Sequence, residues 1–209
     1  MNRSFLLLVI PSLVLLATAP ATAQRSGAVD DAALRAADPT EWLSHGRDPA
    51  ETYYSPLDQI SASNVDRLGL AWSWDIKGYR GRLEATPLFS DGVLYATGIW
   101  SVVFAVDART GEELWRWDPA IVQGGRDNGG TSICCGPVNR GPALYDDKVY
   151  AGLLDGRLVA LDAKTGRVVW VQQTTPVGGE YSVTMAPRIA NGNVIIGNSG
   201  AEYGVRGYV

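Results

Sequence analysis

The residues with the clearest chemical potential are Cys134 and Cys135, which are adjacent and are the only two cysteines in the 209-residue chain. Consecutive Cα atoms lie only about 3.8 Å apart, whereas an ordinary disulfide spans roughly 4.4–6.8 Å. A bond between them would close a small, rigid ring that restricts little of the unfolded chain. Such a ring would offer a flat, polarisable surface to a planar ligand. The alternatives are two unpaired core residues or pairing between molecules, and adjacency alone leaves all three open.

Three different polar residues stand shortly before a proline in successive parts of the chain: Glu84, Arg140 and Thr184. Glu84 and Thr184 occupy the same repeat position, and Arg140 is shifted by one. Structural repeats normally carry the same residue at one point, so this variety indicates a binding site near the axis of the fold. The cysteine pair lies just before Arg140, in a connection of 27 positions from Trp115 to Pro142, against 15 and 17 in the neighbouring units.

The elements that must position these residues repeat along the chain. Residues 104–111 (FAVDARTG) recur 55 positions later as residues 159–166 (VALDAKTG), and a tryptophan follows each copy at the same offset. Each copy is typical of two strands joined by a turn in which Asp caps and Gly supplies a positive φ. An earlier half-copy ends at residues 72–75 (WSWD), which match residues 115–118 (WRWD). Upstream of each unit come a proline, a turn and a short apolar strand, expected at residues 93–96, 149–151 and 194–196.

Four short strands per unit predict the blade of an all-β fold, a β-propeller with four-stranded antiparallel blades. Seven Trp, nine Tyr and 24 Gly agree with many short strands and tight turns. A two-sheet sandwich is the alternative, but the regular register over three units favours the propeller. Too few blades fit in this length to close a ring. We therefore expect residues 41–209 to form the first three to four blades, the N-terminal part of an incomplete propeller.

The first 23 residues have the order of a secretory signal peptide: a basic residue, an apolar run and small residues at the cleavage site. Arg3 precedes the apolar run 5–17, and the residues Ala21 to Ala23 precede Gln24. The run is too short for a comfortable membrane span, and no lipoprotein cysteine follows it, so membrane association is not expected. We expect cleavage after Ala23 and export to the periplasm, where a disulfide can persist. Residues 24–40 are expected to be a loosely held leader of the mature chain.

The composition argues against several classes of function. The formal net charge is −4, the pI is near 5.0, and the basic residues are scattered, so no nucleic-acid partner is expected. His45 is the only histidine, which argues against a histidine metal site or a Ser-His-Asp triad and favours a structural role. It lies in a segment, residues 41–55, that is expected to pack over one end of the fold. Residues 61–68 are expected to form a helical turn.

With these residues in place, residues 41–209 resemble the pyrroloquinoline-quinone (PQQ)-dependent alcohol dehydrogenases of the methanol/ethanol family, which are eight-bladed propellers. The specific parts are residues 83–87 (LEATP), the cysteine pair followed by Asn139-Arg140-Gly141, Thr184, and residues 199–207 (SGAEYGVRG). The two Asp-Ala-x-Thr-Gly turns are weaker support, because non-enzymatic propellers share them.

The resemblance implies that the Cys134–Cys135 ring stacks on one face of PQQ and that Glu202 ligates Ca²⁺ or a lanthanide. The residues implied to hold the carboxylates and carbonyls of the cofactor are Glu84, Arg140, Thr184, Ser199, Gly200 and Ala201. A guanidinium suits a carboxylate or quinone oxygen, and a carboxylate suits a hard cation. The alternatives are a surface ion pair for Arg140 and a solvated turn position for Glu202.

The implied activity is oxidation of primary alcohols to aldehydes in the periplasm, with a small alcohol as substrate and a cytochrome c as electron acceptor. The family's catalytic Asp base is expected downstream, so no catalytic residue is assigned within this chain, which is expected to be inactive alone. Gly136-Pro137 stands where many relatives have Asp, so the wall of the substrate cavity is expected to differ.

Haem c is undetermined, because the family's haem motif would lie at a far C-terminus, and a homodimer is one assembly that the resemblance allows. The alternative function is a non-catalytic periplasmic propeller scaffold of the outer-membrane assembly type. Such a scaffold would need neither the cysteine pair nor a carboxylate at position 202.

Overall fold

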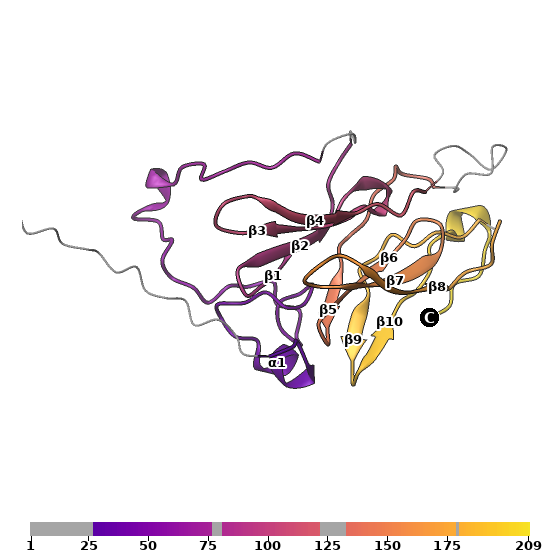
Figure 1. Ribbon diagram of the computed structural model, residues 1–209, viewed down its shortest axis with the longest axis horizontal. Helices are drawn as coiled ribbons and strands as arrows, with labels where there is room; N and C mark the ends of the chain where they lie inside the picture. The colour runs from indigo at the N-terminus through magenta and orange to yellow at the C-terminus, as the bar shows by residue number, and fades with distance from the viewer. Residues whose placement is uncertain (1–26, 77–80, 122–132, 179) are drawn as a thin grey trace, which may run out of the picture.

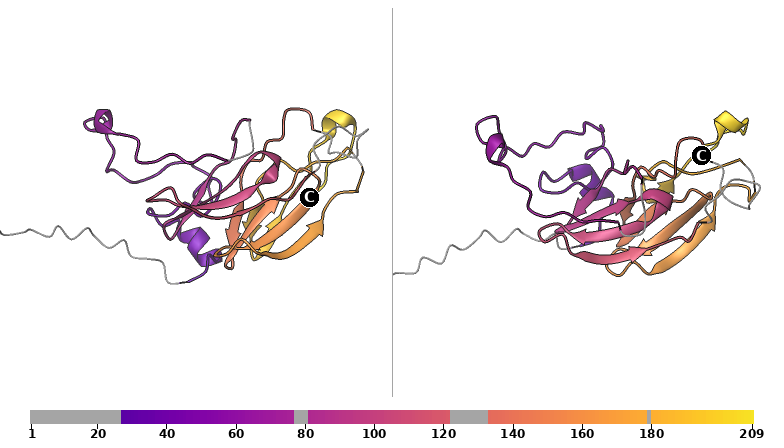
Figure 2. Two further views of the ribbon diagram at one scale, coloured as in Figure 1. Left: turned by 45° about the horizontal axis from the view of Figure 1, so that its top comes forward. Right: turned by 90° about the horizontal axis from the view of Figure 1, so that it is seen from above.

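Three antiparallel sheets lie side by side in the computed structural model, which describes residues 27–76, 81–121, 133–178 and 180–209 (Figures 1 and 2). The first sheet contains β1 (Leu88–Ser90), β2 (Val93–Thr97), β3 (Val103–Asp107) and β4 (Glu113–Trp117). The second contains β5 (Ala143–Tyr145), β6 (Lys148–Gly152), β7 (Arg157–Asp162) and β8 (Val168–Gln173). The third contains β9 (Arg188–Ala190) and β10 (Asn193–Ile195).

Within the first two sheets the strand order follows the chain, β1-β2-β3-β4 and β5-β6-β7-β8. This is the meander of a propeller blade, so the predicted all-β propeller is confirmed, with two whole blades and one strand pair of a third. Short helical elements interrupt the connections: α1 (Asp31–Ala36), η1 (Val65–Arg67), η2 (Ile99–Ser101) and η4 (Ala201–Tyr203). The helical turn expected in residues 61–68 is therefore present.

The hairpin turns form because their residues tolerate a left-handed backbone. The turn between the first two strands of each unit has positive φ at both central positions, which are Asp91-Gly92, Asp146-Asp147 and Asn191-Gly192. A two-residue turn of this kind requires positive φ at both places, and Asn, Asp and Gly accept it at the lowest cost. All three turns lie where the repeat predicts them.

A tryptophan of one unit docks on the Asp-Ala-x-Thr-Gly turn of the next. The indole N–H of Trp115 on β4 donates to the carbonyl of Ala163 at 2.9 Å. A Cβ added to Gly166 would lie only 2.6 Å from the Trp115 ring, so the ring rests on the bare backbone of the turn. Trp72 makes the same contact with the turn that carries Ala108, at 3.0 Å. These contacts tie each unit to its successor.

The segment around Trp72 and Trp74 does not form the strand that the half-copy predicts; residues 69–76 are irregular. Its side chains hold it in place instead. Trp74 packs against Phe104, with ring centroids 4.3 Å apart, and Arg116 lies 5.3 Å from the centre of the Trp74 ring. In the described residues this segment has no strand partner for its backbone, which explains the missing strand.

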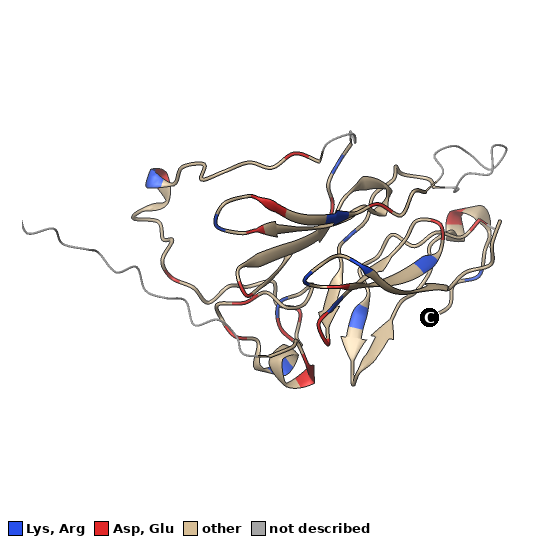
Figure 3. Ribbon diagram, in the orientation of Figure 1, with Lys and Arg blue, Asp and Glu red and all other residues tan. Residues whose placement is uncertain are grey.

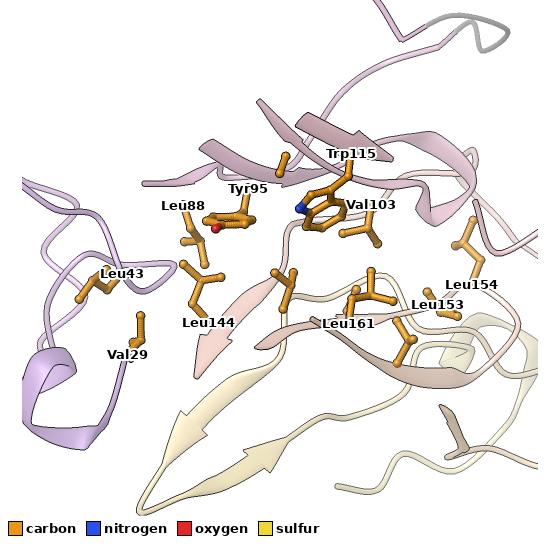
Figure 4. Close-up of a cluster of buried hydrophobic side chains, with 14 of the residues drawn as sticks. Val29, Leu43, Leu88, Tyr95, Val103, Trp115, Leu144, Leu153, Leu154 and Leu161 are labelled. Carbon is orange, nitrogen blue, oxygen red and sulfur yellow. The ribbon is translucent and has the colours of Figure 1, made fainter. Parts of the chain in front are cut away.

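The main hydrophobic cluster lies between the first two sheets (Figure 4). Leu88 and Val103 from the first blade face Leu144 and Leu161 from the second, and all four are buried. Full burial of one such side chain stabilises the fold by about 1.5–3 kcal/mol. The cluster therefore fixes the two blades against each other and sets the spacing of the connections between them.

The leader is not loosely held over residues 27–40, so that expectation is wrong for the part of it that the structure describes. Val29 is buried in the main cluster, and its carbonyl accepts a hydrogen bond from the amide of Asp146 at 2.8 Å. Asp30 caps α1 by accepting from the amide of Ala33. An isolated apolar residue such as Val29 has no periodic pattern, which is why the sequence does not reveal this contact.

Charged residues are dispersed over both blades and the leader rather than gathered in one field (Figure 3). Among the described residues, no helix has the length and apolarity needed to cross a bilayer. The predicted signal peptide, residues 1–23, lies outside the described residues.

Candidate functional site

The connections that precede β1, β5 and β9 run side by side and are hydrogen-bonded in succession. The amide of Thr86 donates to the carbonyl of Arg140 at 3.2 Å, and the amide of Arg140 donates to the carbonyl of Thr184 at 2.9 Å. Gly141 makes this approach possible, because it has φ +123° and an added Cβ would lie 2.9 Å from the Thr86 carbonyl oxygen. Three units thus present their connections at one place.

Arg140 joins the polar side chains of these connections. Its Nη2 lies 3.5 Å from Oε2 of Glu84, and its Nη1 donates to the hydroxyl of Thr184 at 2.8 Å. The Thr184 hydroxyl lies 3.1 Å from the hydroxyl of Ser199. The prediction that Glu84, Arg140 and Thr184 meet at one point is confirmed.

The guanidinium of Arg140 remains accessible, since the side chain is 48% exposed. An exposed ion pair contributes only about 0–1 kcal/mol to folding, so the contact with Glu84 stabilises the fold little. Arginine has five N–H donors in a planar fork, and only part of them are used by Glu84 and Thr184. Among the described residues, the other donors have no side-chain acceptor and can bind an anionic ligand.

Cys134 and Cys135 form a disulfide with their Cα atoms 3.8 Å apart, and both residues are exposed. This confirms the bond within the chain and excludes the two alternatives. The loop is tied to the first blade, because the amide of Trp100 donates to the carbonyl of Pro137 at 2.8 Å. An exposed disulfide ring therefore stands six positions before Arg140.

Ser199 and Glu202 lie at the two ends of a tight turn. Ser199 exchanges both backbone hydrogen bonds with Ser182, at 2.7 and 3.2 Å, which fixes its hydroxyl beside Thr184. Gly200 has φ +123°, and an added Cβ would clash with the carbonyl oxygen of Glu180. Ala201 and Glu202 follow in η4, where both are exposed.

Glu202 is an exposed carboxylate in this turn, and the assignment of this residue as a metal ligand stays a prediction. Across the described ranges, no group of three or more His, Cys, Asp or Glu residues is placed to hold a metal ion. A hard cation takes six or more oxygen ligands.

The only histidine lies away from this cluster, beside a cavity of about 330 Å³ between the leader and the strands β5 and β9. His45 packs edge-on against Tyr53, with centroids 5.7 Å apart. Burial, followed by the positive charge of Arg188, lowers the pKa of His45, which favours the neutral ring at pH 7. These contacts agree with the structural role expected for this residue.

One residue of the site was not assigned any role from the sequence. Asn139 is fully buried beside Arg140, and its amide makes hydrogen bonds to both blades. A signal was present, because Asn139 stands three positions before Pro142, the place that Glu84 and Thr184 occupy before their own prolines.

The exposed groups suit a flat, anionic ligand. The disulfide ring offers a surface for its face, Arg140 offers a planar cation for a carboxylate, and the hydroxyls of Thr184 and Ser199 offer hydrogen bonds. PQQ has this form, since it is planar and carries carboxylates and quinone carbonyls. The residues present therefore fit one wall of a PQQ site.

Comparison with known proteins identifies the family. The model of the PQQ family described as glucose/ethanol/alcohol dehydrogenase, β-propeller domain, matches residues 42–206. Quinohemoprotein alcohol dehydrogenase ADH IIB of Pseudomonas putida is 58% identical over 200 residues, which are 95% of this chain and 28% of that protein. The 1-butanol dehydrogenase (cytochrome c) of Thauera butanivorans is 51% identical over 170 residues, 81% of this chain and 24% of that protein.

A solved structure titled europium-containing methanol dehydrogenase superimposes with a TM-score of 0.72 at 35% identity, covering 81% of this chain and 29% of that chain. The chain thus spans between 24% and 29% of the length of these three proteins. Because the family model covers most of the chain and the blades have the expected topology, the chain belongs to the β-propeller family of PQQ-dependent alcohol dehydrogenases.

Proposed function

We propose that the full-length protein oxidises primary alcohols to aldehydes in the periplasm with PQQ and passes the electrons to a cytochrome c. The observation that carries this proposal is the exposed disulfide, six positions before Arg140 along the chain, together with the side chains that meet at Arg140. Further support comes from the similarity to a quinohemoprotein alcohol dehydrogenase and to a 1-butanol dehydrogenase (cytochrome c). The order of the first 23 residues supports the periplasmic location.

In this proposal the residues of the chain bind and orient the cofactor. Cys134–Cys135 lies against one face of PQQ, and Arg140 binds a carboxylate or a quinone oxygen. Glu84 holds the guanidinium in place through its ion pair. The remaining polar contacts come from Thr184, Ser199, and the backbone of Gly200 and Ala201.

Glu202 is one ligand of a Ca²⁺ or lanthanide ion in this proposal. Its position at the end of the turn that begins with Ser199 places a carboxylate near the polar cluster along the chain. The lanthanide option is supported by the similarity to the europium-containing methanol dehydrogenase. When bound, PQQ supplies a two-electron acceptor and the metal a Lewis acid.

Binding of PQQ to the full-length apoprotein tests the proposal, with Arg140→Lys as the variant. Lysine keeps the charge but loses the planar fork, so we expect the Kd for PQQ to rise at least tenfold, which is about 1.4 kcal/mol or more. Arg188→Lys is a matched control, because Arg188 also pairs with a glutamate, Glu51, at similar exposure. It should leave the Kd unchanged. A wild-type apoprotein that does not bind PQQ would instead indicate a propeller scaffold.

A further inference from the structure

Asn139 is the most completely bonded side chain of the site, and it is 1% exposed. Its Oδ1 accepts from the hydroxyl of Thr97 at 2.8 Å and from the amide of Gly141 at 3.1 Å. Its Nδ2 donates to the hydroxyl of Ser101 at 3.1 Å and to the carbonyl of Gly152 at 2.7 Å. An asparagine amide can accept two hydrogen bonds and donate two, so the Asn139 side chain makes all the hydrogen bonds that it can.

These partners belong to both blades. Thr97 ends β2 and Ser101 lies in η2, both in the first blade, whereas Gly152 ends β6 in the second. The hydroxyl of Ser101 also accepts from the amide of Leu154, at 3.1 Å. The Asn139 side chain is therefore the centre of a buried polar contact between two blades.

The turn η2, whose Ser101 accepts a hydrogen bond from Asn139, has an unusual backbone. Trp100 has φ +56° and Ser101 has φ +59°, a conformation that is sparsely populated by residues other than glycine. Such a turn persists only when its surroundings over-determine it. Two hydrogen bonds hold η2 against the segment that follows the cysteine pair. One runs from the amide of Trp100 to the carbonyl of Pro137, and the other from the amide of the Asn139 side chain to the hydroxyl of Ser101.

The inward amide also determines where Arg140 lies. The backbone amide and carbonyl of Arg140 bond to neighbouring connections on both sides, as in a strand, where successive side chains point in opposite directions. With Asn139 directed into the blade contact, Arg140 is directed to Glu84 and Thr184. Loss of the amide bonds would free both the guanidinium and the disulfide loop.

We propose that Asn139 is a positioning residue for cofactor binding. Its buried amide fixes the loop Cys134–Val138 and the direction of the Arg140 side chain, so that the disulfide and the guanidinium meet the cofactor together. This inference rests on the proposed function. It concerns a residue that itself touches no ligand and acts through Arg140 and the loop.

The test uses the full-length apoprotein with Asn139→Asp, which keeps the shape and the acceptors but loses both donors. Two quantities are measured: the Kd for PQQ by equilibrium titration, and the rate at which dithiothreitol reduces Cys134–Cys135. We expect the Kd to rise at least tenfold and the reduction to become at least several-fold faster. Leu161→Ala is the control, because it removes buried volume from β7 without touching the polar contact. It should lower the melting temperature and leave both quantities unchanged.

A second variant keeps the test valid if Asn139→Asp does not fold. Thr97→Val removes one hydroxyl donor at constant shape, and we expect a smaller change in the same direction. In the double variant the two effects on log Kd should not add, since both act on one network.

An unchanged Kd in the Asn139 or Thr97 variants, with wild type binding PQQ, overturns the positioning role alone. The role is also overturned if Leu161→Ala weakens PQQ binding as much at an equal loss of melting temperature. Failure of the wild type to bind PQQ overturns the proposed function itself.

Discussion

Arg140 contacts three units at once. Its backbone bonds to the connections on both sides, and its side chain reaches Glu84 on one side and Thr184 on the other. The exposed ion pair adds little to folding. The arrangement is better explained by ligand binding, because it leaves an exposed cation six positions after an exposed disulfide.

The disulfide leads to the first prediction at this scale. In the full-length protein, the double change Cys134→Ser with Cys135→Ser should leave the melting temperature of the apo form nearly unchanged, because the bond closes almost no loop and both residues are exposed. Alcohol oxidation should collapse. Calorimetry of the apo form and an activity assay are the measurements. A large loss of apo stability would instead show that the bridge is structural.

Glu202 leads to the second prediction. Glu202→Gln keeps the shape of the side chain and removes its charge, so the full-length variant should fold and be exported normally. Metal affinity should fall tenfold or more, which is about 1.4 kcal/mol or above, with partial recovery of activity at high Ca²⁺. Isothermal calorimetry of metal binding is the measurement. Equal binding by Glu and Gln at this position would remove the residue from the metal site.

At the scale of elements, the repeated contact of a tryptophan with the following turn positions the blades. The Trp115 ring lies on Gly166, and the equivalent Trp72 ring lies on Gly111. Asp107 fixes the turn that carries Gly111 by accepting from the amides of Arg109 and Thr110. The hydrogen bonds with Thr110 lower the pKa of Asp107. The ionised carboxylate therefore stabilises the folded turn at any pH above the ordinary pKa of an aspartate. This stabilisation is lost as the pH falls through the lowered pKa of Asp107.

Gly166→Ala should destabilise the full-length protein more than Gly92→Ala. Both glycines have φ in the left-handed region, where a Cβ costs about 1–2 kcal/mol.

 The two angles are +70° at Gly166 and +80° at Gly92. At Gly92 an added Cβ meets nothing within 4 Å, whereas at Gly166 it meets the Trp115 ring at 2.6 Å. Overpacking of this kind adds about 1–3 kcal/mol. Thermal unfolding of both variants is the measurement, and equal losses would show that the tryptophan contact does not constrain the turn.

Much of this level of structure could be predicted from the sequence. The hairpin turns are predictable because few residues accept positive φ, and the repeat positions of Glu84 and Arg140 predict that they meet. The contact of Trp115 with a turn 48 residues away is not predictable from the sequence, because no local pattern identifies the carbonyl to which an indole N–H donates. The burial of Val29 was missed for the same reason, since it depends on a partner far along the chain.

At the scale of the whole molecule, two blades and part of a third carry one wall of a site. In this chain the outer strand β8 exposes Trp170, which stands at the same repeat offset as Trp115. Trp115 is buried by the turn of the following unit. If the repeat continues, Trp170 would contact the turn of the following blade as Trp115 contacts the turn that carries Ala163.

The location of the protein leads to the last prediction. If residues 1–23 direct export and are removed, the protein recovered from the periplasm should begin at Gln24. Mass spectrometry of the purified N-terminus is the measurement, with the cytoplasmic fraction as the control. An exported protein that still begins with Met1 would remove the argument that the cysteines meet an oxidising compartment.

The backbone ladder from Thr86 through Arg140 to Thr184 also sets an order in time. A chain is synthesised from its N-terminus, so Glu84 is made 100 residues before Thr184. A nascent chain that ends within the second blade contains Cys134, Cys135 and Arg140 but lacks the hydroxyls of Thr184 and Ser199. If the proposed cofactor site needs all of these groups, cofactor binding has to follow the synthesis and docking of the third blade.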